Sequence, residues 1–244
     1  MPDKIALVTG GASGIGYAIA KTLASDMTVI ITDINREEGQ SSAAGINALF
    51  EYADLAKADE CRSLVERVER QYGAVGILVN NAGFQHVSPI AEFPEAVWVN
   101  MLQVMLTAPF LLTKYVWPGM VSQHWGRIIN IASVHAQVAS LYKAGYTSCK
   151  HGLIGLTKTS ALEGGDCGIT ANAICPAYVR TPLVDSQITA QAANLGISES
   201  EVLSSVFLKN AAIKRMIEPG EIGEMVKYLC SDAASAVTGS SWNI

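Results

Sequence analysis

Residues 9–16 read TGGASGIG and stand between the apolar run KIALV (residues 4–8) and a stretch with helical periodicity. Glycines at such a junction let the backbone approach a pyrophosphate, and a helix that begins there directs its free N–H groups at the phosphates. The alternative is a plain strand-to-helix turn without a ligand. The position between the first predicted strand and the first predicted helix favours a dinucleotide site.

The rhythm of strand and helix continues along the whole chain. Short apolar runs rich in β-branched residues alternate with stretches of helical periodicity, and the runs are residues 4–10, 27–33, 48–54, 75–81, 126–132 and 168–176. Because nearly every run is apolar on both faces, we expect the strands to be buried between two helical layers. The pattern predicts an α/β fold, with one domain over residues 1–244 and a Rossmann-like, doubly wound parallel sheet. Residues 182–216 contain no predicted strand and are expected to form a small helical lid over a ligand.

Composition and charge exclude several classes of function. With 244 residues, of which 50% are hydrophobic, the chain can bury a large core. The formal net charge of −5 gives no basic surface for nucleic acid or for a polybasic membrane anchor. The sequence shows no apolar run of about 18 residues and no signal-peptide pattern, so we expect a cytoplasmic protein that acts on small molecules. The five scattered cysteines show no CxxC spacing and the four histidines no metal-ligand spacing, so no metal site is predicted.

Asp33 ends the second predicted strand, about 20 residues after the glycines. A carboxylate there can accept hydrogen bonds from both hydroxyls of an adenosine ribose and repels a 2′-phosphate, which favours NAD over NADP. Arg36 leaves the choice open, because a nearby guanidinium can accommodate that phosphate. A solvated acid at a strand end is the structural alternative for Asp33.

A second group of residues indicates acid–base chemistry. Tyr146 and Lys150 are four residues apart, so on a helix their side chains point the same way. A nearby ammonium favours the phenolate, which brings a tyrosine toward the working pH of a general base. Ser133 follows the fifth predicted strand, at the edge where open α/β sheets bind ligands. An exposed pair without function is the alternative for Tyr146 and Lys150.

These motifs together resemble the short-chain dehydrogenase/reductase family over nearly the whole chain. They are TGGASGIG, NNAG (residues 80–83), Ser133, and YTSCK (residues 146–150). The resemblance implies that Tyr146 exchanges the substrate proton, Ser133 positions the substrate oxygen, and Lys150 binds the nicotinamide ribose. It implies an NAD site formed by Gly10, Ser13, Gly14, Ile15, Gly16, Asp33, Asp54, Leu55, Asn81, Ala82, Gly83, Tyr146, Lys150, Pro176, Val179 and Thr181. It also implies a homotetramer built from the helices after strands four and five and from the last strand.

Four further residues suggest a substrate with a carboxylate. His135 and Lys143 lie between Ser133 and Tyr146, while Gln85 follows NNAG and Gln187 begins the predicted lid. Converging donors of this kind bind a small anion. Together with NNAGFQHV and PAYVRTPLVDSQI, they resemble the D-3-hydroxybutyrate dehydrogenases. That resemblance implies that these four side chains hold the carboxylate of 3-hydroxybutyrate, that an aromatic ring at Tyr178 packs over it, and that the product is acetoacetate.

The chain departs from the family pattern at three places. Met105 stands where an asparagine usually completes a proton relay, Ala177 replaces a glycine, and Tyr178 replaces the usual tryptophan. The sequence also ends at Ile244, without the DGG tail that usually follows the last strand. We expect activity to survive the change at Met105, with the relay the step most affected.

Two other functions stay open at this point. The same fold and chemistry can serve another substrate, such as a 3-oxoacyl thioester, a different hydroxy acid, a sugar or a steroid. A protein that binds NAD as a sensor or scaffold without chemistry is the second alternative, against which the set Ser133, Tyr146 and Lys150 argues.

Overall fold

The computed structural model describes residues 4–209 and 211–244. Seven parallel strands form one sheet in the order β3-β2-β1-β4-β5-β6-β7. In chain order they are β1 (Ile5–Thr9), β2 (Thr28–Asp33), β3 (Leu49–Tyr52), β4 (Ile77–Asn80), β5 (Gly126–Ile131), β6 (Ile169–Cys175) and β7 (Ser241–Asn243). Each predicted run forms a strand, and the predicted doubly wound parallel sheet is confirmed. The strand order reverses between β1 and β4, and ligands of such sheets bind at this switch point.

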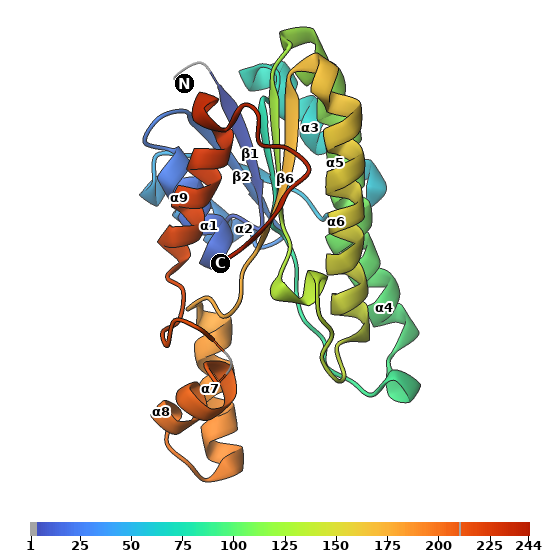
Figure 1. The fold of residues 1–244 in the computed structure, drawn as a ribbon. Helices are drawn as coiled ribbons and strands as arrows, with labels where there is room; N and C mark the ends of the chain where they lie inside the picture. Colours follow the sequence, from blue (N-terminus) through green and yellow to red (C-terminus); the bar gives the residue numbers. More distant parts are fainter. Residues whose placement is uncertain (1–3, 210) are drawn as a thin grey trace.

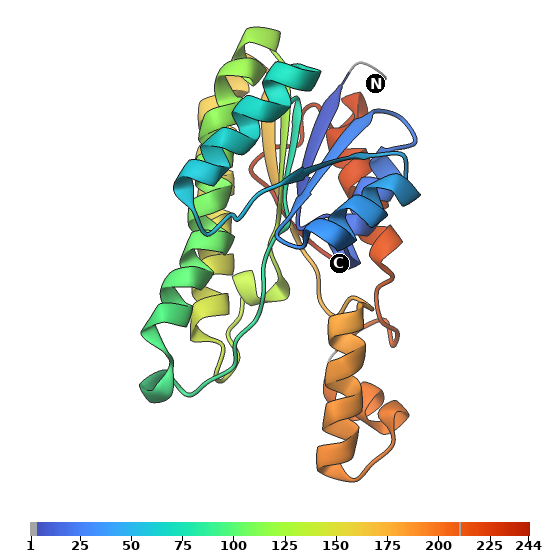
Figure 2. The ribbon, with the colours of Figure 1, turned by 180° about the vertical axis from the view of Figure 1, so that it is seen from behind.

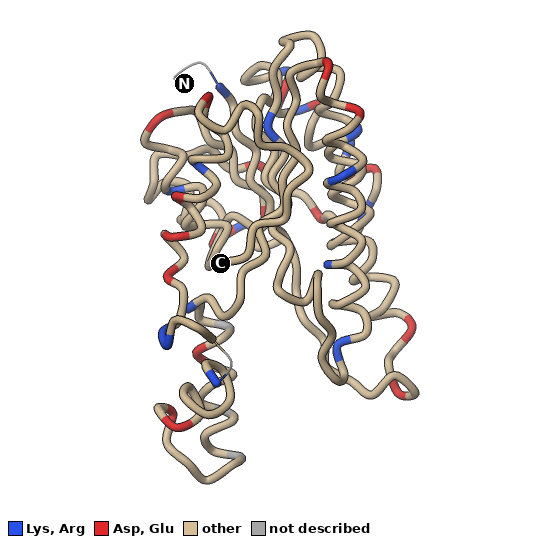
Figure 3. The backbone as a smooth tube through the Cα atoms, viewed as in Figure 1, with Lys and Arg blue, Asp and Glu red and all other residues tan. Residues whose placement is uncertain are grey.

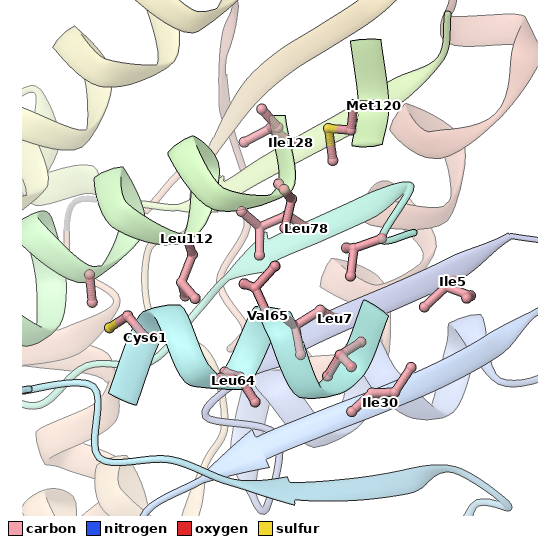
Figure 4. Close-up of a cluster of buried hydrophobic side chains, with 14 of the residues drawn as sticks. Ile5, Leu7, Ile30, Cys61, Leu64, Val65, Leu78, Leu112, Met120 and Ile128 are labelled. Atoms are coloured by element: carbon pink, nitrogen blue, oxygen red, sulfur yellow. The ribbon is translucent and has the colours of Figure 1, made fainter. Parts of the chain in front are cut away.

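Helices cover both faces of the sheet (Figures 1 and 2). One face packs against α1 (Gly14–Leu23), α2 (Arg36–Gly45) and α9 (Pro219–Cys230), and the other against α3 (Ala58–Tyr72), α5 (Ala108–Gln123) and α6 (Ala144–Gly164). Figure 4 shows the second layer, where side chains of α3 and α5 such as Leu64 and Leu112 meet Leu7 and Leu78 of the sheet. Every residue of β1, β4, β5 and β6 is buried, which explains why these strands read as continuous apolar runs.

One helix of 29 residues runs from Glu95 to Gln123. It consists of α4 (Glu95–Leu102), the π-helical turn η2 (Gln103–Thr107) and α5. Its apolar window has a mean hydropathy of 1.5, enough by length and composition to cross a membrane, although the sequence analysis expected no such segment. Leu112, Val116 and Met120 are fully buried against the sheet, so the inner side of this helix belongs to the protein core. One third of the window (33%) is buried, so this part of the helix packs as a core helix of the protein does.

Residues 182–209 and 211–216 leave the body of the molecule as a helical projection (Figure 1). It contains α7 (Pro182–Leu195), α8 (Glu199–Val202) and the π-helical turn η5 (Leu203–Phe207). A small core of its own is formed by Ile188, Val202, Phe207 and Met216. A single parallel β-bridge between Val179 and Ile217 joins the two chain segments at its base.

Short turns and charges complete the surface. The 3₁₀ helices η1 (Ile90–Glu92), η3 (Val134–Ala136), η4 (Gly165–Cys167) and η6 (Asp232–Ala234) lie in connecting segments. Lysine and arginine residues are interspersed with aspartate and glutamate along the chain, as Figure 3 shows. This distribution fits the net charge of −5.

Candidate active site

A cleft of about 540 Å³ opens at the carboxyl ends of β1, β4, β5 and β6. Most of the residues predicted for the cofactor and the substrate line it. They are Gly10, Ser13, Gly14, Ile15, Asp33, Asn81, Ala82, Gly83, Gln85, Ser133, His135, Lys143, Tyr146, Lys150, Pro176, Tyr178, Val179, Thr181 and Gln187. Side chains far apart in the sequence thus meet at one edge of the sheet, as its topology requires.

A second cavity of about 440 Å³ shares a wall with the cleft. Asp54 and Leu55 line it, so these two predicted residues lie in a separate compartment near the end of β2. Asn100 and Val104 of the long helix also line this second cavity. Neither was predicted, because the sequence does not reveal how closely this helix approaches the end of β2.

The glycine turn is shaped for close approach of a ligand. Gly10 and Gly14 have φ of +62° and +55°, and a Cβ atom at Gly10 would lie 2.9 Å from Cα of Ala82. Ser13 is the N-cap of α1 and its side chain makes no capping hydrogen bond, so the first N–H groups of the helix are available to phosphates. These features fit the pyrophosphate of a dinucleotide.

Gly16 was predicted to bind the cofactor but does not line either cavity. A Cβ atom at this position would overlap the carbonyl oxygen of Gly10 and the amide of Asn81. The residue therefore permits the tight packing of α1 against the glycine turn, which is a structural role. Asn81 fixes that turn from the other side, because its Nδ2 donates to the carbonyl oxygens of Thr9 and Gly10 over 2.9 and 3.1 Å.

The carboxylate of Asp33 is held at the mouth of the glycine turn. Its Oδ2 accepts from the backbone N–H of Ala12 over 3.2 Å and its Oδ1 from that of Asn35 over 3.0 Å. The guanidinium of Arg36 stacks over the ring of Tyr52, with 4.4 Å from Cζ to the ring centroid. This stack gives Arg36 a partner other than a ligand phosphate. The arrangement suits a ribose with free hydroxyls.

Lys150 and Tyr146 lie side by side on α6. The Lys150 ammonium is buried, donates a hydrogen bond of 2.7 Å to the carbonyl oxygen of Ile131, and lies 5.5 Å from the Tyr146 ring centroid. Burial lowers the pKa of Lys150 to about 8. Burial also raises the pKa of Tyr146, and hydrogen bonding to Ser133 opposes this only in part. The spacing of Tyr146 and Lys150 predicts the opposite direction for the Tyr146 pKa, because the sequence shows the neighbouring ammonium and does not show the burial.

Ser133 and His135 form a polar cluster at the start of η3. Oγ of Ser133 lies 3.3 Å from Nδ1 of His135 and also accepts from the His135 backbone N–H over 3.2 Å. Nε2 of His135 lies 2.8 Å from Oγ of the exposed Ser140. Burial and, to a lesser extent, the charge of Lys143 lower the pKa of His135, so the ring is neutral at neutral pH. Each of the two nitrogens of the His135 ring thus lies within hydrogen-bonding distance of a serine hydroxyl. Ser140 was not predicted, since a loop serine five residues from a histidine carries no recognisable pattern.

The residues expected around a substrate carboxylate border the same end of the cleft. Lys143 is half-buried, which lowers the pKa of its ammonium, and no hydrogen bond or ion pair to it is found among residues 4–209 and 211–244. Gln85, in the segment before η1, and Gln187, on α7, also line the cleft. The ring of Tyr178 packs against Phe207 of the projection, with centroids 4.7 Å apart.

Met105 lies in the π-helical turn η2 and is fully buried. It packs with Met101 and Cys149, and its Sδ lies 3.0 Å from the position of a Cβ atom built on Gly83. The side chain therefore fills core space between the long helix and the NNAG segment. π-Helical turns occur frequently at functional sites, and this one lies beside the predicted cofactor site.

Two other types of site are a nucleophilic cysteine and a metal centre. Burial raises the pKa of the Cys149 thiol to about 11, so at neutral pH it is a poor nucleophile. Within the described part of the chain, no group of three or more metal-ligating side chains was found.

Comparisons with known proteins agree with this geometry. Residues 4–192 match the sequence profile described as short chain dehydrogenase. The D-beta-hydroxybutyrate dehydrogenase of Cupriavidus necator is 41% identical, with 99% of this chain and 96% of that protein covered. The acetoacetyl-CoA reductase of Paracoccus denitrificans is 33% identical, with 98% and 95% covered. A solved structure of a variant actinorhodin polyketide ketoreductase with NADPH superposes with a TM-score of 0.91, at 34% identity and with 99% and 95% covered.

Proposed function

This chain belongs to the short-chain dehydrogenase family, and on that premise we propose that it is an NAD-dependent (R)-3-hydroxybutyrate dehydrogenase that forms acetoacetate reversibly. One observation carries the substrate assignment: the Lys143 ammonium, which has no polar partner among the described residues, lines the same cleft as Ser133 and Tyr146. A cation in the same cleft as the acid–base pair suits a short acid whose hydroxyl is near its carboxylate.

Each residue has a defined part in the proposed mechanism. Ser133 donates a hydrogen bond to the substrate oxygen, and Tyr146 takes the hydroxyl proton as hydride leaves the substrate carbon. Bound NAD would supply the hydride acceptor, and its positive ring would favour the phenolate that burial disfavours. Lys150 would hold the ribose hydroxyls, and its ammonium would add to the same stabilisation of the phenolate.

The proposed carboxylate site combines a charge with neutral donors. Lys143 would pair with the carboxylate, Gln85 and Gln187 would donate from either side, and Tyr178 would cover it. His135 would donate to the carboxylate only if it gave up its hydrogen bond to Ser140 or to Ser133, because both of its ring nitrogens are hydrogen-bonded. We therefore assign the main charge recognition to Lys143.

The cofactor site is proposed to prefer NAD. Gly10, Ser13, Gly14 and Ile15 would hold the pyrophosphate, Asp33 the adenosine ribose, and Asp54 and Leu55 the adenine, while Asn81, Ala82, Gly83, Pro176, Val179 and Thr181 would surround the rest. The carboxylate of Asp33, anchored by Ala12 and Asn35, supports this preference because it would repel a 2′-phosphate.

A screen that follows NADH or NADPH by absorbance tests the proposal. Both cofactors are offered with short 3-hydroxy acids of each hand, and acetoacetyl-CoA is offered in the reducing direction. We expect turnover with (R)-3-hydroxybutyrate and NAD. Faster turnover of acetoacetyl-CoA with NADPH would replace the proposal with a thioester reductase, the second candidate, which the acetoacetyl-CoA reductase relative and the NADPH-bound structural neighbour favour.

We further propose that the protein is a cytoplasmic homotetramer. Phe110 on α5 is 50% exposed and Leu162 on α6 is 87% exposed, so adjacent helices present apolar side chains away from the sheet. Exposed apolar side chains on adjacent helices support a contact between protein chains at this face. Light scattering of the wild-type protein and of a Phe110→Asp, Leu162→Asp double variant tests this, with a smaller assembly expected for the variant.

A further inference from the structure

Glu38 lines the cofactor cleft and was not predicted from the sequence. It lies on the wall of the same cleft as Asp33, whereas its neighbour Glu37 lines neither cavity. Glu38 belongs to the first turn of α2, the helix that follows β2 and Asp33. Residue type alone carried no signal, because acidic residues are favourable in the first turn of any helix. The cleft therefore contains a second carboxylate besides that of Asp33.

Asn35 connects these two carboxylates. Its backbone N–H donates to Oδ1 of Asp33 over 3.0 Å, and its side-chain Nδ2 donates to Oε2 of Glu38 over 2.8 Å. Oδ1 of the same amide accepts from the backbone N–H of Glu38 over 3.3 Å, which caps α2. One residue thus holds both acids at the end of the cleft where the adenosine ribose is proposed to bind.

The charge of Glu38 has no counter-charge beside it. Among residues 4–209 and 211–244, its carboxylate forms no ion pair and its Oε1 accepts no hydrogen bond. Arg36, two residues away in the sequence, stacks on Tyr52 and lines neither cavity. Asp33 and Glu38 therefore give this end of the cleft a negative potential.

We propose that Glu38 is a second determinant of cofactor preference, which weakens the binding of a 2′-phosphate, and that Asn35 is the residue that positions it. The inference rests on the proposed NAD site and extends it, because that proposal assigns the preference to Asp33 alone. A phosphate on the adenosine ribose would meet two carboxylates instead of one, and NAD lacks this phosphate. The two acids also offset the positive N-terminal end of α2, which by itself would favour an anion.

Glu38→Gln tests this proposal, with Glu37→Gln as the matched control. Both variants remove one negative charge from the first turn of α2 with little change in shape, and both side chains are exposed. Fluorescence titration without substrate gives the dissociation constants of NADH and NADPH, which differ only in the 2′-phosphate. We expect Glu38→Gln to bind NADPH roughly three- to fivefold more tightly than the wild type, the size of an effect between exposed charges. Its affinity for NADH, and both affinities of Glu37→Gln, should change by less than about twofold.

Two further measurements separate charge from shape and test Asn35. Raising the salt concentration should shrink the gain in Glu38→Gln, because salt screens the repulsion that the variant removes. Asn35→Ser keeps an oxygen that can cap α2 but removes the amide that holds Glu38. This variant should bind NADPH more tightly than the wild type, with a smaller gain than Glu38→Gln.

Equal changes in NADPH affinity in Glu38→Gln and Glu37→Gln would overturn the role of Glu38, as would a gain that salt leaves unaltered. A wild-type ratio of the two dissociation constants in Asn35→Ser would remove Asn35 as the positioning residue. A wild-type protein that binds NADPH more tightly than NADH would contradict the proposed preference for NAD instead. The comparison of Glu38→Gln with Glu37→Gln would then still decide whether Glu38 opposes the phosphate.

Discussion

The ammonium of Lys150 donates a hydrogen bond of 2.7 Å to the carbonyl oxygen of Ile131, the last residue of β5. A neutral acceptor replaces only part of the hydration of a buried charge, and burial lowers the pKa of Lys150 from 10.5 to about 8. The protein therefore keeps a cation beside Tyr146 at a cost to its own stability.

Lys150→Met should consequently stabilise the fold while it abolishes turnover. Below pH 8 the wild type carries the full cost of the buried charge, so the variant should have the larger free energy of unfolding, by the order of 3 kcal/mol. Between pH 8 and 10.5 the unfolded wild-type chain binds more protons than the folded one, so wild-type stability rises and the difference shrinks. Urea unfolding of both proteins across this pH range measures the difference in their free energies of unfolding. Lys158→Met, an exposed position on the same helix, is the control, and a difference that does not vary with pH would contradict the argument.

Tyr146→Phe should lose activity without losing cofactor affinity. Removing the general acid–base group should lower kcat by about 10²- to 10⁴-fold. Titration of NADH fluorescence should give a dissociation constant close to that of the wild type, because the phenyl ring remains. Tyr142→Phe, which changes a tyrosine that is 53% exposed, should behave as the wild type. Normal turnover in Tyr146→Phe would show that another group moves the proton. A wild type that binds NADH and turns over no substrate would support the sensor or scaffold function.

Lys143→Ala should weaken substrate binding more than it slows the reaction. Loss of a charged hydrogen bond of about 1.5–3 kcal/mol should raise KM for 3-hydroxybutyrate roughly 10- to 100-fold. Steady-state kinetics with NAD in excess measure the change, and Lys158→Ala controls for the loss of one positive charge from α6. If KM is unaltered even when His135 and Lys143 are both replaced, the carboxylate does not bind at this end of the cleft.

Asp33→Ser should shift cofactor preference toward NADP. The variant removes the carboxylate that would repel a 2′-phosphate, and Arg36 can then leave Tyr52 to bind that phosphate. We expect kcat/KM for NADP to rise at least about tenfold, since about 1.4 kcal/mol is enough for that change. Glu37→Gln removes one negative charge from the exposed side of α2. This control separates the effect of losing direct contact with the Asp33 carboxylate from the effect of a change in net charge. Equal gains in the two variants would contradict direct recognition.

Met105→Asn should destabilise the protein and leave its pH–rate profile unchanged. The amide would be buried in a cluster formed with Met101 and Cys149, where an unpaired polar group costs about 1–3 kcal/mol. Met105→Leu keeps the apolar volume and should cost less than about 1.5 kcal/mol. Thermal unfolding and pH–rate measurements test both parts. A pH–rate profile that moves in Met105→Asn alone would mean that this side chain does take part in proton transfer.

The sequence predicted what depends on pattern. Strands that are apolar on both faces predicted a buried parallel sheet, and the glycine turn with Asp33 predicted the cofactor end of the cleft. Effects that depend on burial in the folded protein could not be predicted. The pKa of Tyr146, for example, is raised because several helices and loops bury its side chain. Nor does helix periodicity reveal a π-helical turn, so the position of Met105 required the structure. The contact between His135 and Ser140 depends on how one loop folds back, which residue type alone does not specify.

The base of the 182–216 projection gives the protein a modular character. Its small core is separate from the two cores beside the sheet, and Val179 and Ile217 join it to the body through one β-bridge. A transplant of this segment from a relative should leave the sheet and the proposed catalytic residues undisturbed, provided that it keeps the contact between Tyr178 and Phe207 and the ion pair between Arg215 and Glu221 of α9. Natural variation or protein engineering can then change substrate specificity by replacing this one segment, while the residues proposed to carry out the reaction stay the same.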